Sequence, residues 1–195
     1  ASDVYKRQEY PLNIKKPYNV TSIESGLDNV LWVGTKQGLI QIDEKDKSKI
    51  NLFKNSRIRN SIVSNVINDI EWDSLRKELW ISTIDGISKY SLMQKSFSNI
   101  QVGPFANSII ENDVTDILIA EKSGTLWFKT RNRSGINSFK AIYSDYDGPD
   151  TSIMHFEHDP IDPFSIADND ITNFIEDRAG PVSYTHLRAH ETSQN

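Results

Sequence analysis

One five-residue phrase recurs three times in this chain. Leu31–Thr35 reads LWVGT, Leu79–Thr83 reads LWIST and Leu126–Thr130 reads LWFKT. The first two tryptophans lie 48 residues apart, and the second and third lie 47 apart. A repeat of this length indicates a propeller, a solenoid or an array, because each copy is then one supersecondary unit.

The residues around each phrase favour strands. VTSIES, VINDIEW and VTDILIA precede the three phrases, and each alternates apolar and polar residues rich in Val, Ile and Thr. A short turn leads into each tryptophan strand, a second turn of the form KQG or IDG follows the first two, and a fourth apolar segment closes those units. The sequence therefore predicts an all-β fold, a β-propeller fragment built of four-stranded antiparallel blades with a period of about 47 residues.

The repeated residues are expected to be structural. A four-stranded sheet with two apolar faces needs neighbouring blades to cover them. We expect the tryptophans to fill the space between blades, and Gly38 and Gly86 to provide turn conformations that a Cβ would resist. The predicted structural positions are Trp32, Gly34, Thr35, Gly38, Trp80, Thr83, Gly86, Trp127 and Thr130.

These phrases, in phase with the strands before them, resemble the two-component regulator propeller repeat over roughly residues 18–180. The stretch HFEHDPIDPFSIADNDITNFIEDRAG at His155–Gly180 resembles that family's junction between blades. Gly34 keeps a glycine usual in the family, whereas Ser82 and Lys129 replace it.

The resemblance implies a fragment of the periplasmic, ligand-sensing part of a hybrid histidine kinase held in the inner membrane. Its expected ligand is a glycan or oligosaccharide. Its expected partners are the remaining blades, a β-sandwich, a membrane helix and a kinase core of the same chain, with the parent protein a homodimer. Two alternatives stay open: a protein-interaction propeller, or a propeller enzyme acting on polysaccharide.

Both ends of the chain depart from the repeat pattern. In the third unit Trp127 lies three residues after Gly124. The same spacing from Gly180 predicts a fourth tryptophan at the position of Ser183. Asp3–Gln8 and Val182–Leu187 instead resemble translations, on opposite strands, of the sequencing-adapter word AGATGTGTATAAGAGACAG. We therefore expect residues 1–8 and 181–195 to be adapter-derived, and 9–180 to hold the propeller repeats, with the first strand of a further blade near 170–177.

Composition excludes several functions. The formal net charge is -5, there is no basic stripe, and nucleic acid is not an expected partner. The absence of cysteine excludes disulfides, thiolate metal sites and a cysteine nucleophile. No run of apolar residues approaches the roughly 20 needed to span a bilayer.

Candidate site residues are few, and we expect no catalytic, cofactor or metal site in this fragment. His155 and His158 are only three residues apart, so a surface junction loop is favoured over a metal site. The acidic run Asp145–Asp150 lacks the spacing of a calcium loop. Arg131 and Arg133 follow the third tryptophan strand and are the candidates for gripping a sugar carboxylate or sulfate.

Overall fold

The computed structural model describes residues 17–57, 60–103, 108–132, 135–140, 153–177, 180 and 182–186. In this part of the chain the regular structure is β-strand, apart from one short 3-10 turn, η1 (Leu27–Asn29). No helix in these ranges is long and apolar enough to cross a membrane.

The described strands form three four-stranded sheets and one two-stranded sheet, and within each sheet every strand pairs antiparallel with the next along the chain. Blade 1 consists of β1 (Val20–Ser25), β2 (Val30–Thr35), β3 (Gly38–Asp43) and β4 (Ile50–Phe53). Blade 2 consists of β5 (Ile67–Asp73), β6 (Glu78–Thr83), β7 (Gly86–Ser91) and β8 (Ser96–Ile100). Blade 3 consists of β9 (Val114–Ala120), β10 (Thr125–Thr130), β11 (Ile136–Lys140) and β12 (Met154–Phe156). The fourth sheet consists of β13 (Ile171–Glu176) and β14 (Val182–His186).

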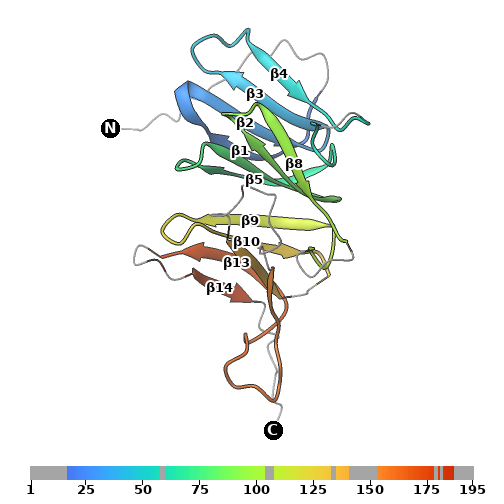
Figure 1. Ribbon diagram of the computed structural model, residues 1–195, viewed down its shortest axis with the longest axis vertical. Helices are drawn as coiled ribbons and strands as arrows, with labels where there is room; N and C mark the ends of the chain where they lie inside the picture. Colours follow the sequence, from blue (N-terminus) through green and yellow to red (C-terminus); the bar gives the residue numbers. More distant parts are fainter. Residues whose placement is uncertain are drawn as a thin grey trace, which may run out of the picture.

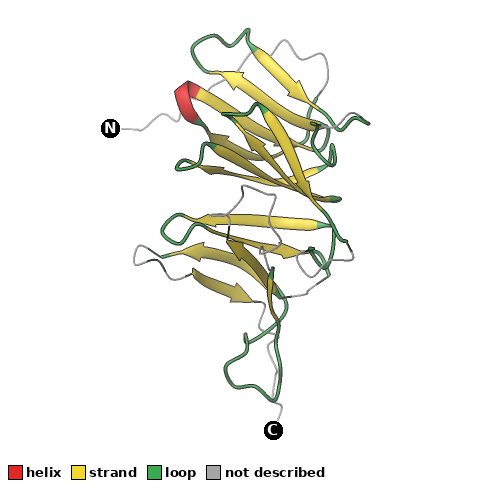
Figure 2. Ribbon diagram, in the orientation of Figure 1, coloured by secondary structure: helices red, strands yellow, loops and turns green. Residues whose placement is uncertain are grey.

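The sheets follow one another in chain order, and each packs on the next (Figure 1). Strands dominate every layer of the molecule (Figure 2). A separate apolar cluster fills each space between consecutive sheets, and these clusters include, in order, Trp32 with Ile70, Trp80 with Ile117, and Trp127 with Phe174. This arrangement confirms the prediction of an all-β, propeller-type fragment made of four-stranded blades.

The strand registers place Trp32, Trp80 and Trp127 at one equivalent position of the second strand in their blades. Counted from the irregularity near the start of β13, the same position in the fourth sheet is Ser183, which pairs with Ile175. The position at which the glycine-to-tryptophan spacing of the third unit predicts a fourth tryptophan is therefore the position that the fold assigns to it.

Each tryptophan is buried to the extent that the next sheet along the chain is complete. Trp32 and Trp80 are each 1% exposed, because a full blade covers each of them. Trp127 is only half-buried, since the fourth sheet has two strands in the described part of the chain.

Threonine and glycine together close the β2–β3 and β6–β7 hairpins. The Thr35 hydroxyl donates a hydrogen bond to the Gly38 carbonyl at 2.7 Å, and Thr83 does the same to Gly86 at 2.8 Å. Gly38 and Gly86 have φ values of +131° and +123°, a region that L side chains rarely adopt. The repeated T-x-x-G spacing thus has a direct conformational cause.

A second repeated motif, S-I-x-x-N, joins consecutive sheets, and its role was missed by the sequence analysis. It occurs at Ser61–Asn65, Ser108–Asn112 and Ser165–Asn169. The asparagine Oδ1 accepts a hydrogen bond from a backbone N–H just beyond the preceding sheet's last strand, in order from Asn55 (2.7 Å), Val102 (2.8 Å) and His158 (2.6 Å).

The serine and isoleucine of this motif stabilise the junction through further contacts. The serine hydroxyl donates to a backbone carbonyl upstream, in order that of Ser56 (3.1 Å), Gly103 (2.8 Å) and Asp159 (2.9 Å). Ile62 and Ile109 are 0% and 1% exposed and lie in the clusters between blades. Each junction is therefore fixed by both polar and apolar contacts.

Of the two segments expected to be adapter-derived, the structure describes part of the C-terminal one and none of the N-terminal one. Residues 1–8 lie outside the described part, whereas Val182–His186 pairs with β13 as β14. Val182 and Tyr184 pack against the apolar cluster of the fourth sheet. The alternation of V-S-Y-T-H suits an edge strand whatever its origin, so its adapter origin stays a prediction.

The turn geometry yields a stability test. A Cβ at Gly38 would stand 2.6 Å from the Phe53 carbonyl oxygen, at a φ unfavourable for alanine. Gly38→Ala should lower the free energy of unfolding by about 2 kcal/mol or more. Gly103→Ala is the control, because a Cβ there meets nothing closer than 3.7 Å. Urea unfolding of both variants measures the difference, and equal losses would contradict this account of the turn.

Candidate functional site

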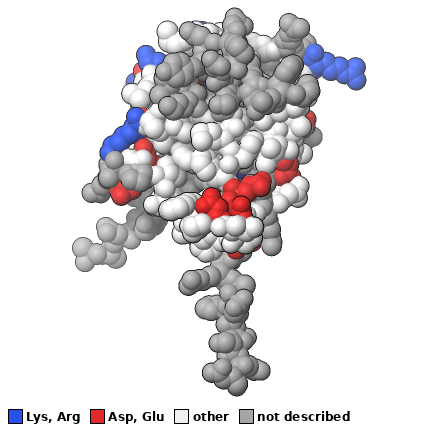
Figure 3. All heavy atoms as spheres, turned by 60° about the horizontal axis from the view of Figure 1, so that its bottom comes forward, with Lys and Arg blue, Asp and Glu red and all other residues white. Residues whose placement is uncertain are grey.

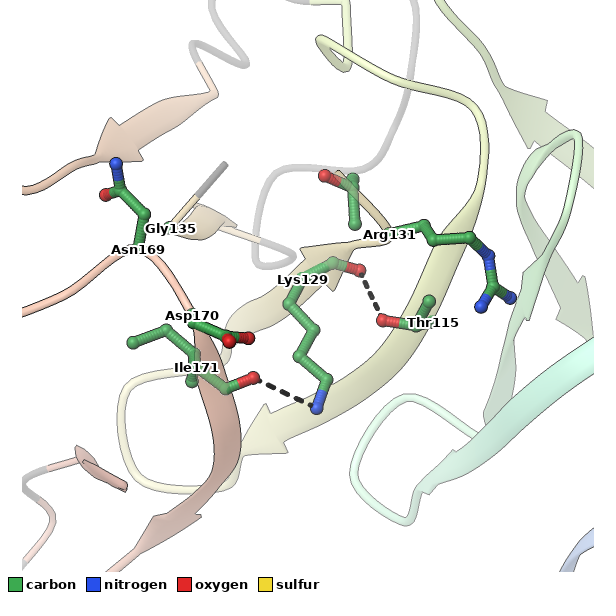
Figure 4. Close-up of a pocket in the computed structure, with 8 residues that line it drawn as sticks. Thr115, Lys129, Arg131, Gly135, Asn169, Asp170 and Ile171 are labelled. Carbon is green, nitrogen blue, oxygen red and sulfur yellow. Dashed lines mark hydrogen bonds between the residues drawn. The ribbon is translucent and has the colours of Figure 1, made fainter. Parts of the chain in front are cut away.

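A polar cavity of about 140 Å³ lies between blade 3 and the fourth sheet (Figure 4). Its walls come from β9, β10, the turn after β10 and the start of β13. The lining residues are Thr115, Lys129, Thr130, Arg131, Gly135, Asn169, Asp170 and Ile171. Both sheets thus contribute hydrogen-bonding groups to one small space.

Lys129 links the two sheets at this cavity. Its ammonium pairs with Asp116 Oδ2 at 3.1 Å and donates to the Thr172 carbonyl oxygen at 2.7 Å. The Lys129 carbonyl accepts a hydrogen bond from the Thr115 hydroxyl at 3.4 Å (Figure 4). The lysine stands at the register position of Gly34 and Ser82 in the other blades, so it places a cation between sheets where blade 1 has a glycine.

Of the two candidate arginines, the structure describes Arg131 and not Arg133. Arg131 lines the cavity, and its Nε pairs with Asp113 Oδ2 at 2.5 Å. Its neighbour Asn132 bonds through Nδ2 to Glu111 Oε1 at 2.5 Å. Arg133 lies outside the described residues. Because Arg131 already pairs with the Asp113 carboxylate, it makes the rim of the cavity polar without adding an unpaired positive charge.

The innermost strands carry a group of carboxylates that sequence reasoning missed. Burial, and then the hydrogen bond and negative charge of Asp116, raise the pKa of Asp69 to about 7. Burial, and then the charges of Glu24 and Asp69, raise the pKa of Glu71 to about 8. Burial also raises the pKa of Glu24. Glu24 and Glu71 lie in neighbouring blades, as do Asp69 and Asp116, and only the packing of blades shows that these carboxylates meet.

The structure places the two histidines in different elements, against different partners. His155 was expected in a junction loop, but it lies in β12, where its Nδ1 is 2.5 Å from Asn137 Oδ1. His158 lies in the junction after β12, with its Nδ1 2.8 Å from the Ile166 carbonyl oxygen. Among the described residues no group of three or more His, Cys, Asp or Glu side chains could hold a metal ion. Asp145–Asp150 lies outside those residues.

Acidic side chains form a group on the face shown in Figure 3, while Lys and Arg side chains lie at its edges. A surface of this kind repels a polyanion instead of concentrating it. That nucleic acid is not a partner stays a prediction from the net charge.

Comparisons with known proteins were informative at the level of solved structures. No family model and no curated protein sequence matches the chain. It is 20% identical to the extracellular domain of a protein described as the hybrid two component system BT3049 from B. thetaiotaomicron, with a TM-score of 0.50 over 87% of this chain and 27% of that one.

Two further likenesses come from proteins with other roles. PorZ, a surface component of the type-IX secretion system of Porphyromonas gingivalis, is 16% identical, with a TM-score of 0.61 over 85% of this chain and 23% of that one. A catalytically inactive virginiamycin B lyase from Staphylococcus aureus, with quinupristin, is 12% identical, with a TM-score of 0.55 over 89% and 57%. At these identities the likenesses show the fold alone. The chain spans about a quarter of the length of the BT3049 domain and of PorZ.

Two lysine–aspartate pairs of similar length permit a matched test of the Lys129 bridge. Lys129 and Asp116 are 16% and 30% exposed, whereas Lys49 and Asp46, 3.3 Å apart, are 69% and 45% exposed. Lys129→Met should lower the free energy of unfolding by about 1–2 kcal/mol, because it leaves a half-buried carboxylate without its cation and a carbonyl without its donor. Lys49→Met should cause no measurable loss. Denaturant titration compares them, and an equally neutral Lys129→Met would refute the bridge.

Proposed function

We propose that this chain is part of the extracytoplasmic, ligand-sensing propeller of a hybrid two-component sensor, and that it binds one unit of a glycan or oligosaccharide in the cavity between blade 3 and the fourth sheet. The carrying observation is that cavity, because two sheets line it with polar groups. A ligand held there contacts both sheets at once. Binding would therefore change how they pack, which is what a sensor requires.

The lining chemistry favours a small polyhydroxylated ligand. Thr115 and Thr130 present hydroxyls, Asn169 an amide, and Lys129 and Asp170 charged groups around a volume of about 140 Å³. Hydroxyl groups of a sugar both donate and accept hydrogen bonds, so they match such a mixed lining. Among the described lining residues Ile171 alone has an apolar side chain, which gives a purely apolar ligand little to contact.

The likeness to an extracellular domain of a two-component system supports this proposal at the level of the fold. Because the chain spans only about a quarter of that domain, the rest of the sensor is part of the proposal: further blades, a β-sandwich, a membrane helix and a kinase core, in an inner-membrane homodimer facing the periplasm. No catalytic activity and no cofactor is assigned to this fragment.

Exposure differences between equivalent positions support further blades. Val20 and Ile23 in β1 are 53% and 57% exposed. The equivalent residues of the three later sheets are 0–6% exposed, each covered by the preceding blade, and they are Ile67 and Ile70, Val114 and Ile117, and Ile171 and Phe174. Blade 1 therefore presents a surface of the kind that a tryptophan-bearing blade covers elsewhere in the molecule.

One observation favours a protein-interaction module as the second candidate. Ile161 and Phe164 are 89% and 95% exposed, and they lie on the same junction loop after β12. Backbone bonds to Asp159, Asp162 and Ser165 hold that loop in one conformation. Phe164 stands one residue before the serine of its S-I-x-x-N motif, and Asn60 has the same position in the first copy of the motif. The Asn60 side chain accepts a hydrogen bond from the Phe97 N–H of β8, the outer strand of blade 2. An outer strand of a completed fourth sheet would thus cover this loop too.

A binding experiment tests the proposal. Titration calorimetry and NMR shift mapping of the whole chain with neutral, amino and acidic monosaccharides and their short oligomers should identify a saccharide that shifts signals of the cavity residues. Thr115→Val removes one lining hydroxyl and should weaken that binding about tenfold, the equivalent of about 1.4 kcal/mol.

Thr125→Val is the matched control, because Thr125 lies at the other end of the β9–β10 ladder from the cavity. It should leave affinity unchanged. The proposal is wrong if no saccharide binds at millimolar concentration, or if the two variants weaken binding equally.

A further inference from the structure

The interface between blades 2 and 3 contains two carboxyl groups in direct contact. Asp69 in β5 and Asp116 in β9 occupy equivalent positions of the innermost strands, opposite Ser82 and Lys129. After burial, the hydrogen bond and the negative charge of Asp116 are the causes that raise the pKa of Asp69. Asp69 Oδ2 also accepts a hydrogen bond from the Ile117 N–H of blade 3 at 3.4 Å. Asp69 therefore reaches from one blade to the next.

A hydrogen bond between two carboxyl groups requires a proton on one of them. Lys129 identifies which one, because its ammonium lies 3.1 Å from Asp116 Oδ2 and favours the ionised form of that group. Among the described residues no cation pairs with Asp69, which faces Asp116 and accepts backbone N–H bonds from Ile70 and Ile117. The charge of Lys129 thus favours the proton on Asp69, as the donor to Asp116.

The charged groups around this pair are mostly negative. Glu71 lies on the same strand as Asp69, and Glu24 on β1 of blade 1 acts on Glu71. The cation facing the pair is Lys129 of β10. Lys36 from the turn after β2 is nearby in the fold, but its ammonium donates to Asn68 Oδ1 at 2.8 Å. Loss of the Asp69 proton would therefore place a second negative charge among carboxylates.

We propose that Asp69 is a proton-operated latch between blades 2 and 3. When protonated, it donates to Asp116 and accepts from the Ile117 N–H, so both blades are held together. When it ionises, one proton leaves to solvent, the carboxyl–carboxylate hydrogen bond is lost, and Asp69 and Asp116 repel each other across the interface. Lys129 connects the latch to the fourth sheet through its bond to the Thr172 carbonyl.

The sign of the pH effect follows from the ionisation of Asp69. Its pKa in the folded chain is about 7, above the ordinary value of 3.8, because of burial first and Asp116 second. The stabilisation is complete below pH 3.8 and decreases as the pH rises from about 4 to about 7, since the unfolded chain releases the proton more readily. Across that window the unfolding constant rises by at most tenfold per pH unit from this group.

Asp69→Asn tests the latch in the intact chain, because the asparagine amide donates to Asp116 and its carbonyl accepts from Ile117 without a titrating proton. Unfolding constants are measured by urea titration at pH 5, 6, 7 and 8. The wild-type constant should rise faster with pH than that of Asp69→Asn, and the variant should be the more stable protein at pH 8. Parallel profiles would overturn the latch.

Asp85→Asn is the matched control, since Asp85 is an exposed carboxylate in the β6–β7 turn of the same blade. Its profile should run parallel to the wild type. A flattening as large as that of Asp69→Asn would show a general charge effect and also overturn the proposal.

A second measurement does not depend on any variant folding. Carbon-13 NMR titration of the side-chain carboxyl groups in the wild-type chain should show Asp69 titrating near neutral pH, separately from Glu71. An Asp69 midpoint near 3.8 would overturn the latch whatever the unfolding data show.

Discussion

Every sheet in this chain depends on its neighbours because each is apolar on both faces. A four-stranded sheet of this kind cannot bury both faces alone, so the space between consecutive sheets becomes the core. The tryptophan of each blade fills that space, and its burial depends on the sheet that follows: Trp80, with a complete blade beside it, is 1% exposed, whereas Trp127, beside two strands, is half-buried. Stability is therefore a property of pairs of blades.

The same constraint determines where function is found. Backbone groups at the ends of the strands and the edges of the sheets meet between blades, and polar side chains satisfy them there. The S-I-x-x-N motif ties each junction at one level. The Asp69–Asp116 pair and Lys129 connect sheets through the first two strands of each blade, away from the junctions. The candidate cavity shares Lys129 with this bridge, so a ligand there and a proton on Asp69 would act on adjacent parts of one network.

Sequence reasoning succeeded where a local pattern has a local cause. The spacing of Trp32 and Trp80 and the turn glycines Gly38 and Gly86 is readable because strand alternation and positive φ values act over a few residues. It failed where the cause is packing between blades. Asp69 and Asp116 are ordinary polar positions of two strands until the blades meet.

Other features were readable but were not recognised. The three copies of S-I-x-x-N stand in the printed sequence, yet they lie in junctions of unequal length, so no single period aligns them. The strand β12 is only three residues long and begins at Met154, so a Pro- and Asp-rich loop was expected over His155. Lys129 was noticed as a departure from glycine, but its partners Asp116 and Thr172 could not be named without the fold.

The most direct measurement is the sequence of the genomic locus across both ends of this chain, read in long continuous reads. The account predicts a natural residue 183 that is tryptophan, a further L-W phrase about 47 residues before the one at Trp32, and a membrane helix and kinase core downstream. A gene that instead encodes Pro181–Asn195 as printed and then stops would contradict it, and would favour a small self-contained interaction module.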